Sequence, residues 1–160
     1  MLTDRSDLSY ASTKTYTHSV GLSCAFRQWR ADSHCKFIHG YPFEITFTFS
    51  SDTLDVRNWV VDFGSLKSLK GQLEDMFDHK LLVAEDDPYR EFLLGLHKLE
   101  IADVRVVPAT GCEACARYVF EIAETWLTDN GYGNRVNLES VEVREHQANS
   151  AIVRRKGNHG

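Results

Sequence analysis

The sequence predicts an α+β fold: a four-stranded antiparallel sheet with two long helices on one face. Two observations predict it. Between residues 41 and 50, apolar side chains alternate with polar ones at every second position, the pattern of a strand with one buried face. Over residues 65–77 and about 111–128, apolar residues recur every three or four positions, as on the buried face of a helix. Helices grouped on one face of an antiparallel sheet form a common α+β arrangement.

The remaining elements are shorter. Residues 14–26 are rich in β-branched and aromatic side chains and predict the first strand. We expect a loop over residues 51–58 and a short return strand over 59–61. Alternating apolar residues over 102–106 and 136–145 predict the last two strands.

Local signals refine the ends of these elements. The alternation of the last strand slips in phase between Leu138 and Val141, which predicts a β-bulge. Thr110 and Glu113 have the spacing of a capping box and predict the start of the second helix. Asn130 and Gly131 predict its end.

The length of 160 residues with 42% hydrophobic content indicates one domain with a substantial core. We expect a flexible N-terminal arm over residues 1–13, a single domain over 14–154 and a flexible tail over 155–160. The chain carries 18 basic and 23 acidic side chains, a net charge of −5, without a basic stripe. This balance argues against nucleic acid as a partner.

The sequence contains neither a signal-peptide pattern nor an apolar run long enough to cross a membrane, so we expect a cytoplasmic protein that does not bind membranes. In a reducing compartment its four cysteines are expected to be free thiols.

Three segments carry side chains suited to chemistry. Cys35, flanked by His34 and His39, precedes the strongest strand. Asp78 and His79 close the first helix. Glu145 continues the phase of Val141 and Val143, which places a carboxylate on a buried strand face, where it needs a hydrogen-bond donor.

Each of these residues also has a purely structural interpretation. Cys35 can be a small packed side chain, His79 a histidine at the negative end of a helix dipole, and Glu113 a capping residue. Cys112 and Cys115 form a C-x-x-C pair, for which packing against the sheet is favoured over a thiolate zinc site. Arg27, Arg30 and Lys36 are candidates for phosphate binding or for solvated surface charge.

In the order and spacing of its motifs from about residue 20 to 154, the chain resembles the 6-carboxytetrahydropterin synthase and 6-pyruvoyl-tetrahydropterin synthase family. The matching segments are Cys35–Tyr41 for C-x-x-x-H-G-H, Val60–Lys67 for V-x-D-F-x-x-L-K, Asp78–His79 for D-H, Glu113 for the helix-initiating glutamate, Val141–Glu145 for V-x-V-x-E and Ala151–Arg154 for the last strand. The resemblance implies a tunnelling fold. It also implies a homo-oligomer, a hexamer whose protomers join sheet edges into a barrel and share active sites.

The resemblance also implies roles for these residues. Cys35 would be the proton-transfer base at the side chain of a pterin substrate, and His79, oriented by Asp78, a second acid–base group. Glu145 would bind the 2-amino and N3 edge of the pterin, with help from Glu113.

The family binds zinc through three histidines, and this chain departs from that pattern. Phe26 and Tyr41 stand at two of the three positions, and only His39 is retained. Because catalytic zinc normally takes three protein ligands, we expect zinc to be absent or weakly bound, with His34 as a conceivable substitute ligand.

Two functions follow from the resemblance. The first is a 6-carboxytetrahydropterin synthase-like lyase that acts on 7,8-dihydroneopterin triphosphate or a related pterin by acid–base chemistry of Cys35, Asp78 and His79. The second is a zinc-free protein of the same fold that binds a pterin or a purine-like ligand without the synthase reaction. Retention of Cys35, Asp78, His79 and Glu145 favours the first, and loss of two zinc positions favours the second.

Overall fold

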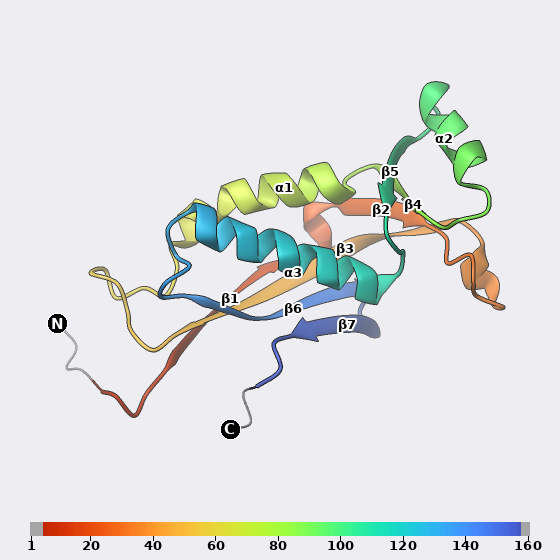
Figure 1. Cartoon of the computed structure of the whole chain (residues 1–160). Coiled ribbons are helices and arrows are strands. Elements are labelled where there is room, and N and C mark those ends of the chain that lie inside the picture. Colours follow the sequence, from red (N-terminus) through yellow and green to blue (C-terminus); the bar gives the residue numbers. More distant parts are fainter. Residues whose placement is uncertain (1–4, 158–160) are drawn as a thin grey trace.

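The structure, a computed structural model, describes residues 5–157 (Figure 1). Residues 1–4 of the expected arm and 158–160 of the expected tail lie outside the described residues. The elements, in chain order, are β1 (Tyr10–Tyr16), β2 (Leu22–Phe26), β3 (His39–Ser51), α1 (Lys67–Phe77), β4 (Lys80–Ala84), α2 (Arg90–Lys98), β5 (Asp103–Val107), α3 (Cys112–Asp129), β6 (Asn137–His146) and β7 (Asn149–Arg154). Short 3-10 turns η1 (His18–Val20), η2 (His34–Lys36) and η3 (Phe63–Leu66) join some of them.

The α+β class is confirmed, but the sheet has seven strands rather than four, and it is mixed rather than wholly antiparallel. Strands β1, β3, β6 and β7 form a four-stranded antiparallel part. At one end β2 pairs antiparallel with β3, and β2, β4 and β5 then pair in parallel. Strand β5 confirms the strand predicted over residues 102–106, β2 comes from the second half of the predicted strand over 14–26, and β4 was not predicted.

The first predicted strand was wrong as a single element. The chain turns at η1 and at Gly21, whose positive φ of 79° suits glycine, so residues 14–26 divide between two strands. Strand β1 begins earlier, at Tyr10, which pairs with Ser51 of β3. Residues 10–13 of the expected arm therefore belong to the sheet.

The predicted return strand over residues 59–61 was also wrong. The carbonyl oxygens of Trp59 and Val60 accept hydrogen bonds from the guanidinium of Arg135, at 3.4 and 2.7 Å. Because a side chain satisfies these backbone groups, the segment needs no neighbouring strand.

The bulge in the last strand is confirmed, and the capping box is not. Thr48 pairs with Ser140 and Phe49 with Leu138, so Glu139 is the extra residue of β6. Helix α3 starts without a side-chain cap, because the Thr110 hydroxyl instead donates to the carbonyl of Arg27 at 2.7 Å.

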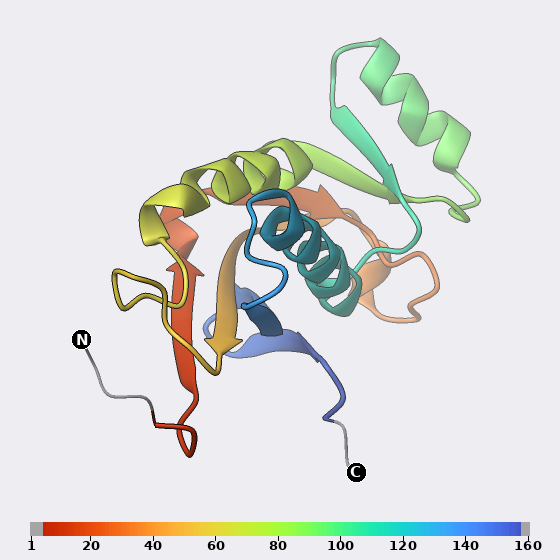
Figure 2. The same ribbon diagram turned by 60° about the vertical axis from the view of Figure 1, so that its left-hand side comes forward.

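Two predicted helices, α1 and α3, cover one face of the sheet, and a third helix, α2, was not predicted (Figure 2). The main core lies under α1 and α3 and contains Phe43, Phe47 and Phe49 of β3, all fully buried. A second, smaller core joins Leu93 of α2 to Leu81 of β4. Leu81 and Leu82 alternate along β4 and belong to different cores, so α2 packs on the opposite face.

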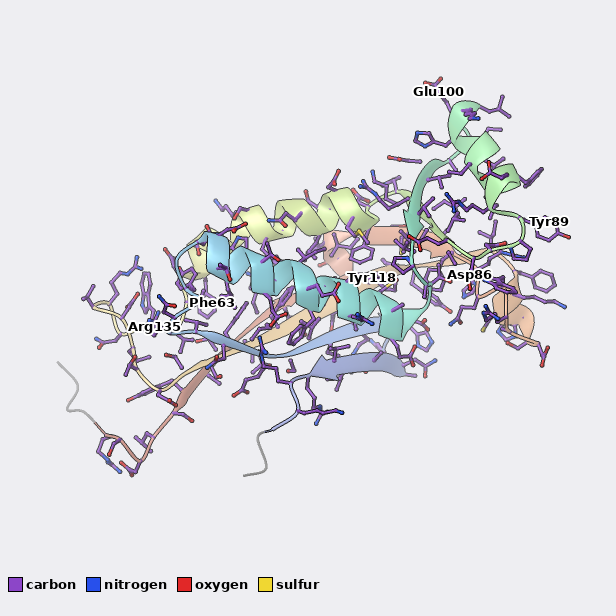
Figure 3. The ribbon with its side chains drawn as sticks, viewed as in Figure 1. Phe63, Asp86, Tyr89, Glu100, Tyr118 and Arg135 are labelled. Carbon is purple, nitrogen blue, oxygen red and sulfur yellow. The ribbon has the colours of Figure 1, made fainter. Side chains whose placement is uncertain are left out.

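An ion pair ties β2 to the loop before α2. Arg27 binds Asp87 through two hydrogen bonds of 2.7 and 3.1 Å, and the Asp87 side chain is only 1% exposed. Burial acts to raise the pKa of Asp87, but the hydrogen bonds from Arg27 and from the backbone N–H of Tyr89 outweigh it and lower the pKa. The neighbouring Asp86 pairs with Arg30 at the surface (Figure 3).

We expect Asp87→Asn to lower the free energy of unfolding at pH 7 by about 2–3 kcal/mol, the scale of lost hydrogen bonds to a charged group. Because the pKa of Asp87 is lowered in the folded state, this stabilisation is present above the unfolded pKa and is lost as the pH falls through the folded pKa. Urea unfolding of both proteins at pH 7 and at pH 3 measures the effect. Asp86→Asn, at the exposed pair, is the control and should lower the free energy of unfolding less than Asp87→Asn does.

Candidate functional site

The ends of β2, β3 and β6 meet at one place and bring a group of polar and aromatic side chains together. His39 of β3 pairs with Phe26 of β2, and their ring centroids are 5.2 Å apart. Tyr41 lies 5.5 Å from the His39 ring and 6.1 Å from the ring of His146, at the end of β6. We call Phe26, Cys35, His39, Tyr41, Glu113, Glu145 and His146 the strand-end cluster.

Glu145 is the half-buried carboxylate of this cluster. Strand β6 bulges here: Arg144 pairs with Ser150 and His146 with Asn149, so Glu145 has no partner residue in β7. Burial raises the pKa of Glu145, His146 and His39 oppose the rise, and Glu113 adds to it. Within residues 5–157 no side chain donates a hydrogen bond to the Glu145 carboxylate at this site. The carboxylate is therefore placed to accept hydrogen bonds from a ligand.

The first residue of α3 holds the strand that carries Glu145. The Cys112 thiol donates to the carbonyl of Val143 at 3.0 Å, and burial raises the pKa of this thiol to about 11. Burial also raises the pKa of Cys24, to about 12, and that of Cys115. These three thiols are therefore packed core residues, as favoured from the sequence for Cys112 and Cys115.

Cys35 lies on η2, just before β3, and is partly exposed. Its thiol is close enough to Tyr41 to contribute to the raised pKa of that phenol, together with burial, the largest cause, and Glu145. Glu113 is exposed at the start of α3, and it acts on the pKa of Glu145. One protomer thus brings Cys35, Glu113 and Glu145 to the same cluster, together with His39.

Asp78 and His79 lie elsewhere in the protomer. The two side chains share a hydrogen bond of 2.6 Å, and His79 is 89% exposed. The His79 N–H donates to the carbonyl of Ser23, three residues before Phe26 and thus about 10 Å along β2. Strand β4, which follows His79, lies on the other side of β2 from β3. The structure does not bring this pair to Cys35 within one chain.

The three positions that the family uses for zinc are adjacent in the structure, but their side chains do not fit the metal. Phe26 has no lone pair, the Tyr41 phenol is held protonated by its raised pKa, and only His39 has a suitable nitrogen. His34 is exposed on η2. Over the part of the chain that the structure describes, no three His, Cys, Asp or Glu side chains gather to hold a metal ion.

The candidate phosphate-binding cations are mostly engaged. Arg27 and Arg30 pair with Asp87 and Asp86, on the loop that Figure 3 marks with Asp86 and Tyr89. Lys36 remains, with its ammonium 5.4 Å from the Phe37 ring.

Sequence reasoning missed one member of the cluster, His146. Its only signal is its place directly after Glu145, and the fold of β6 against β3 is needed to bring it to Tyr41. A separate apolar cavity of about 530 Å³ lies between the edge of β1 and residues 54–64, where Figure 3 labels Phe63, and it shares no residue with the cluster. Among the described helices, none is long and apolar enough to span a membrane.

The chain is similar in sequence or fold to several known proteins. The chain is 25% identical over 137 residues to 6-carboxy-5,6,7,8-tetrahydropterin synthase of Aquifex aeolicus, with 83% of each chain covered. The fold is similar to that of an uncharacterized protein of Wolinella succinogenes, with a TM-score of 0.79, 20% identity and coverage of 93% and 99% of the two chains. It is also similar to a catalytic-residue mutant of Plasmodium vivax 6-pyruvoyltetrahydropterin synthase, with a TM-score of 0.67, 15% identity and coverage of 91% and 98%.

The match to a family profile covers most of the chain. Residues 15–156 match the profile described as 6-pyruvoyl tetrahydropterin synthase, a range that includes every strand-end cluster residue and most of the sheet. The profile, the curated relative and the shared fold agree with the motifs found in the sequence. The chain therefore belongs to the 6-pyruvoyl tetrahydropterin synthase family.

Proposed function

We propose that the protein is a 6-carboxytetrahydropterin synthase-like lyase that acts on 7,8-dihydroneopterin triphosphate or a related pterin. The observation that carries this proposal is Glu145, a half-buried carboxylate with a raised pKa, on a bulge at the end of β6. Family membership and the Aquifex aeolicus relative support a pterin synthase-like function. Turnover of 7,8-dihydroneopterin triphosphate by the purified protein is the direct test.

Glu145 suits the edge of a pterin ring. A pterin presents two adjacent N–H donors, at its 2-amino group and at N3, that match the two oxygens of a carboxylate. The burial that raises the pKa of Glu145 also excludes competing water, so such a pair of hydrogen bonds gains strength. Glu113, at the start of α3, is the second proposed contact to the ring.

Cys35 is the proposed proton-transfer group at the pterin side chain. It lies on the turn before β3, beside Tyr41, and is accessible enough to meet a ligand held by Glu145. A positioned acid–base side chain typically accelerates proton transfer by about 10²–10⁴-fold.

Asp78 and His79 are the proposed second acid–base group, supplied by another copy of the chain. The pair is preformed by a 2.6 Å hydrogen bond, yet it faces outward from its own protomer. A homo-oligomer in which the exposed His79 of one copy meets Cys35 of the next would complete the site. The open edges of β1 and β7 favour such an assembly, because unpaired strand edges tend to associate.

A second candidate function has its own supporting observation. Phe26 and Tyr41 stand at two family zinc positions, which favours a protein that binds a pterin or purine-like ligand without the synthase reaction. Pterin binding with no turnover by the wild-type protein would select this alternative.

We expect Glu145→Gln to weaken binding of 7,8-dihydropterin by about 2–4 kcal/mol, because an amide donor replaces one acceptor oxygen of a charge-assisted pair. Cys35→Ala should leave this binding nearly unchanged and abolish turnover. Calorimetric titration and the turnover assay separate the two effects. Glu142→Gln is the matched control, since Glu142 pairs with Arg144 on the opposite face of β6. Equal affinity of wild type and Glu145→Gln would show that Glu145 is not the pterin contact.

We also expect the thermal stability of the protein to depend on pH through the ionisation of Glu145. Its pKa is raised in the folded state, so the stability it contributes is present below the unfolded pKa and is lost as the pH rises through the folded pKa. Glu145→Gln should therefore match the wild type in thermal stability near pH 4 and exceed it near pH 8. Thermal unfolding at both pH values measures this, and a variant less stable than the wild type at pH 8 would contradict it.

A site shared between copies predicts complementation. Cys35→Ala and His79→Ala should each be inactive alone, whereas subunits mixed by unfolding and refolding together should regain activity at about a quarter of their sites. Light scattering of the wild type should show a trimer-based oligomer. A stable monomer at micromolar concentration, or mixed variants that stay inactive, would place the complete site within one chain.

A further inference from the structure

The strand-end cluster contains two hydrogen-bonding side chains, Tyr41 and His39, side by side at positions where the family binds zinc. Tyr41 and His39 are two residues apart on β3, so both side chains point to the same face of the sheet. Their rings meet edge to face, with centroids 5.5 Å apart. Phe26 closes the group on the β2 side, 5.2 Å from His39 and 6.2 Å from Tyr41.

The contacts of both groups leave one polar atom of each for a ligand. The Nδ1 atom of His39 lies 2.7 Å from the carbonyl oxygen of Phe37, and a carbonyl only accepts, so Nδ1 donates there. The Nε2 atom is then left for a ligand hydroxyl, which can donate to it or accept from it. The Tyr41 phenol carries an O–H that can donate.

Such a pair suits a ligand with neighbouring hydroxyl groups. A hydroxyl both donates and accepts hydrogen bonds, so one hydroxyl of a substrate can donate to His39 while the next accepts from Tyr41. With Glu145 on the ring edge, and the ring of the adjacent His146 6.1 Å from the Tyr41 ring, the hydroxylated side chain of a pterin would reach this pair. Phe26 adds an apolar wall and no ligand for a metal ion.

We propose that Tyr41 and His39 bind the adjacent hydroxyls of the pterin side chain directly, in place of a resident metal ion. The inference rests on the proposed function, because it takes Glu145 as the contact to the pterin ring. It adds Tyr41 as a specificity-determining residue for the hydroxylated side chain of the substrate.

The test compares two ligands that differ only in the side chain. We expect the wild type, dialysed against a chelator and free of zinc by elemental analysis, to bind 7,8-dihydroneopterin about three- to tenfold more tightly than 7,8-dihydropterin, the scale of one neutral hydrogen bond. Tyr41→Phe keeps the ring and should remove most of this preference without changing the affinity for 7,8-dihydropterin. Tyr89→Phe, at an exposed tyrosine outside the cluster, is the control and should retain the preference.

The outcomes distinguish this inference from the function on which it rests. A wild type that binds neither pterin, or a Glu145→Gln variant that binds both as the wild type does, overturns the proposed function and this inference with it. A preference that survives in Tyr41→Phe overturns this inference alone. So does stoichiometric zinc that His39→Ala removes, or a preference that the chelator abolishes and added zinc restores.

Discussion

The pairing of β3 with its neighbours is the constraint on which the rest of the structure depends. This strand has 13 residues: its first part pairs with β2, and its second part pairs with β1. Because side chains alternate along a strand, the register that buries Phe43, Phe47 and Phe49 also directs His39 and Tyr41 toward the same face. A slip of one residue would expose the core and turn both candidate site residues away, so folding and site geometry share one register.

Half-burial of the Glu145 carboxylate lowers the stability of the fold, because no side chain of residues 5–157 donates a hydrogen bond to it. The bulge at the end of β6 frees the residue from ladder pairing with β7, while Cys112 of α3 holds the strand through the carbonyl of Val143. The ionised carboxylate therefore lowers stability at neutral pH, and under the proposed function hydrogen bonds from a ligand would offset this cost. The start of α3 and the bulge of β6 hold Glu145 in place, an arrangement expected of a binding residue more than of a packing residue.

The family fold and the family metal site are separable in this protein. The backbone at Phe26, His39 and Tyr41 keeps three side chains adjacent, as a metal site requires, but two of the three are aromatic groups that pack on one another. The packing of these aromatic rings adds stability without the exact ligand positions that a bound metal ion would require. The Asp78 and His79 pair is preformed by a 2.6 Å hydrogen bond, and in the proposed shared site its partner comes from another copy of the chain.

The sequence alone determined the features that rest on local periodicity: the strand over residues 41–50, the helices near 65–77 and 111–128, the bulge after Leu138, and the inward phase of Glu145. Only the tertiary structure decided the features that depend on distant partners. Residues 14–26 divide because two short strands pair with separate stretches of β3, and β4 forms between β2 and β5 because parallel pairing needs neighbours remote in the chain. For the same reason, the separation of Asp78 and His79 from Cys35 followed from strand order, which no spacing along the chain encodes.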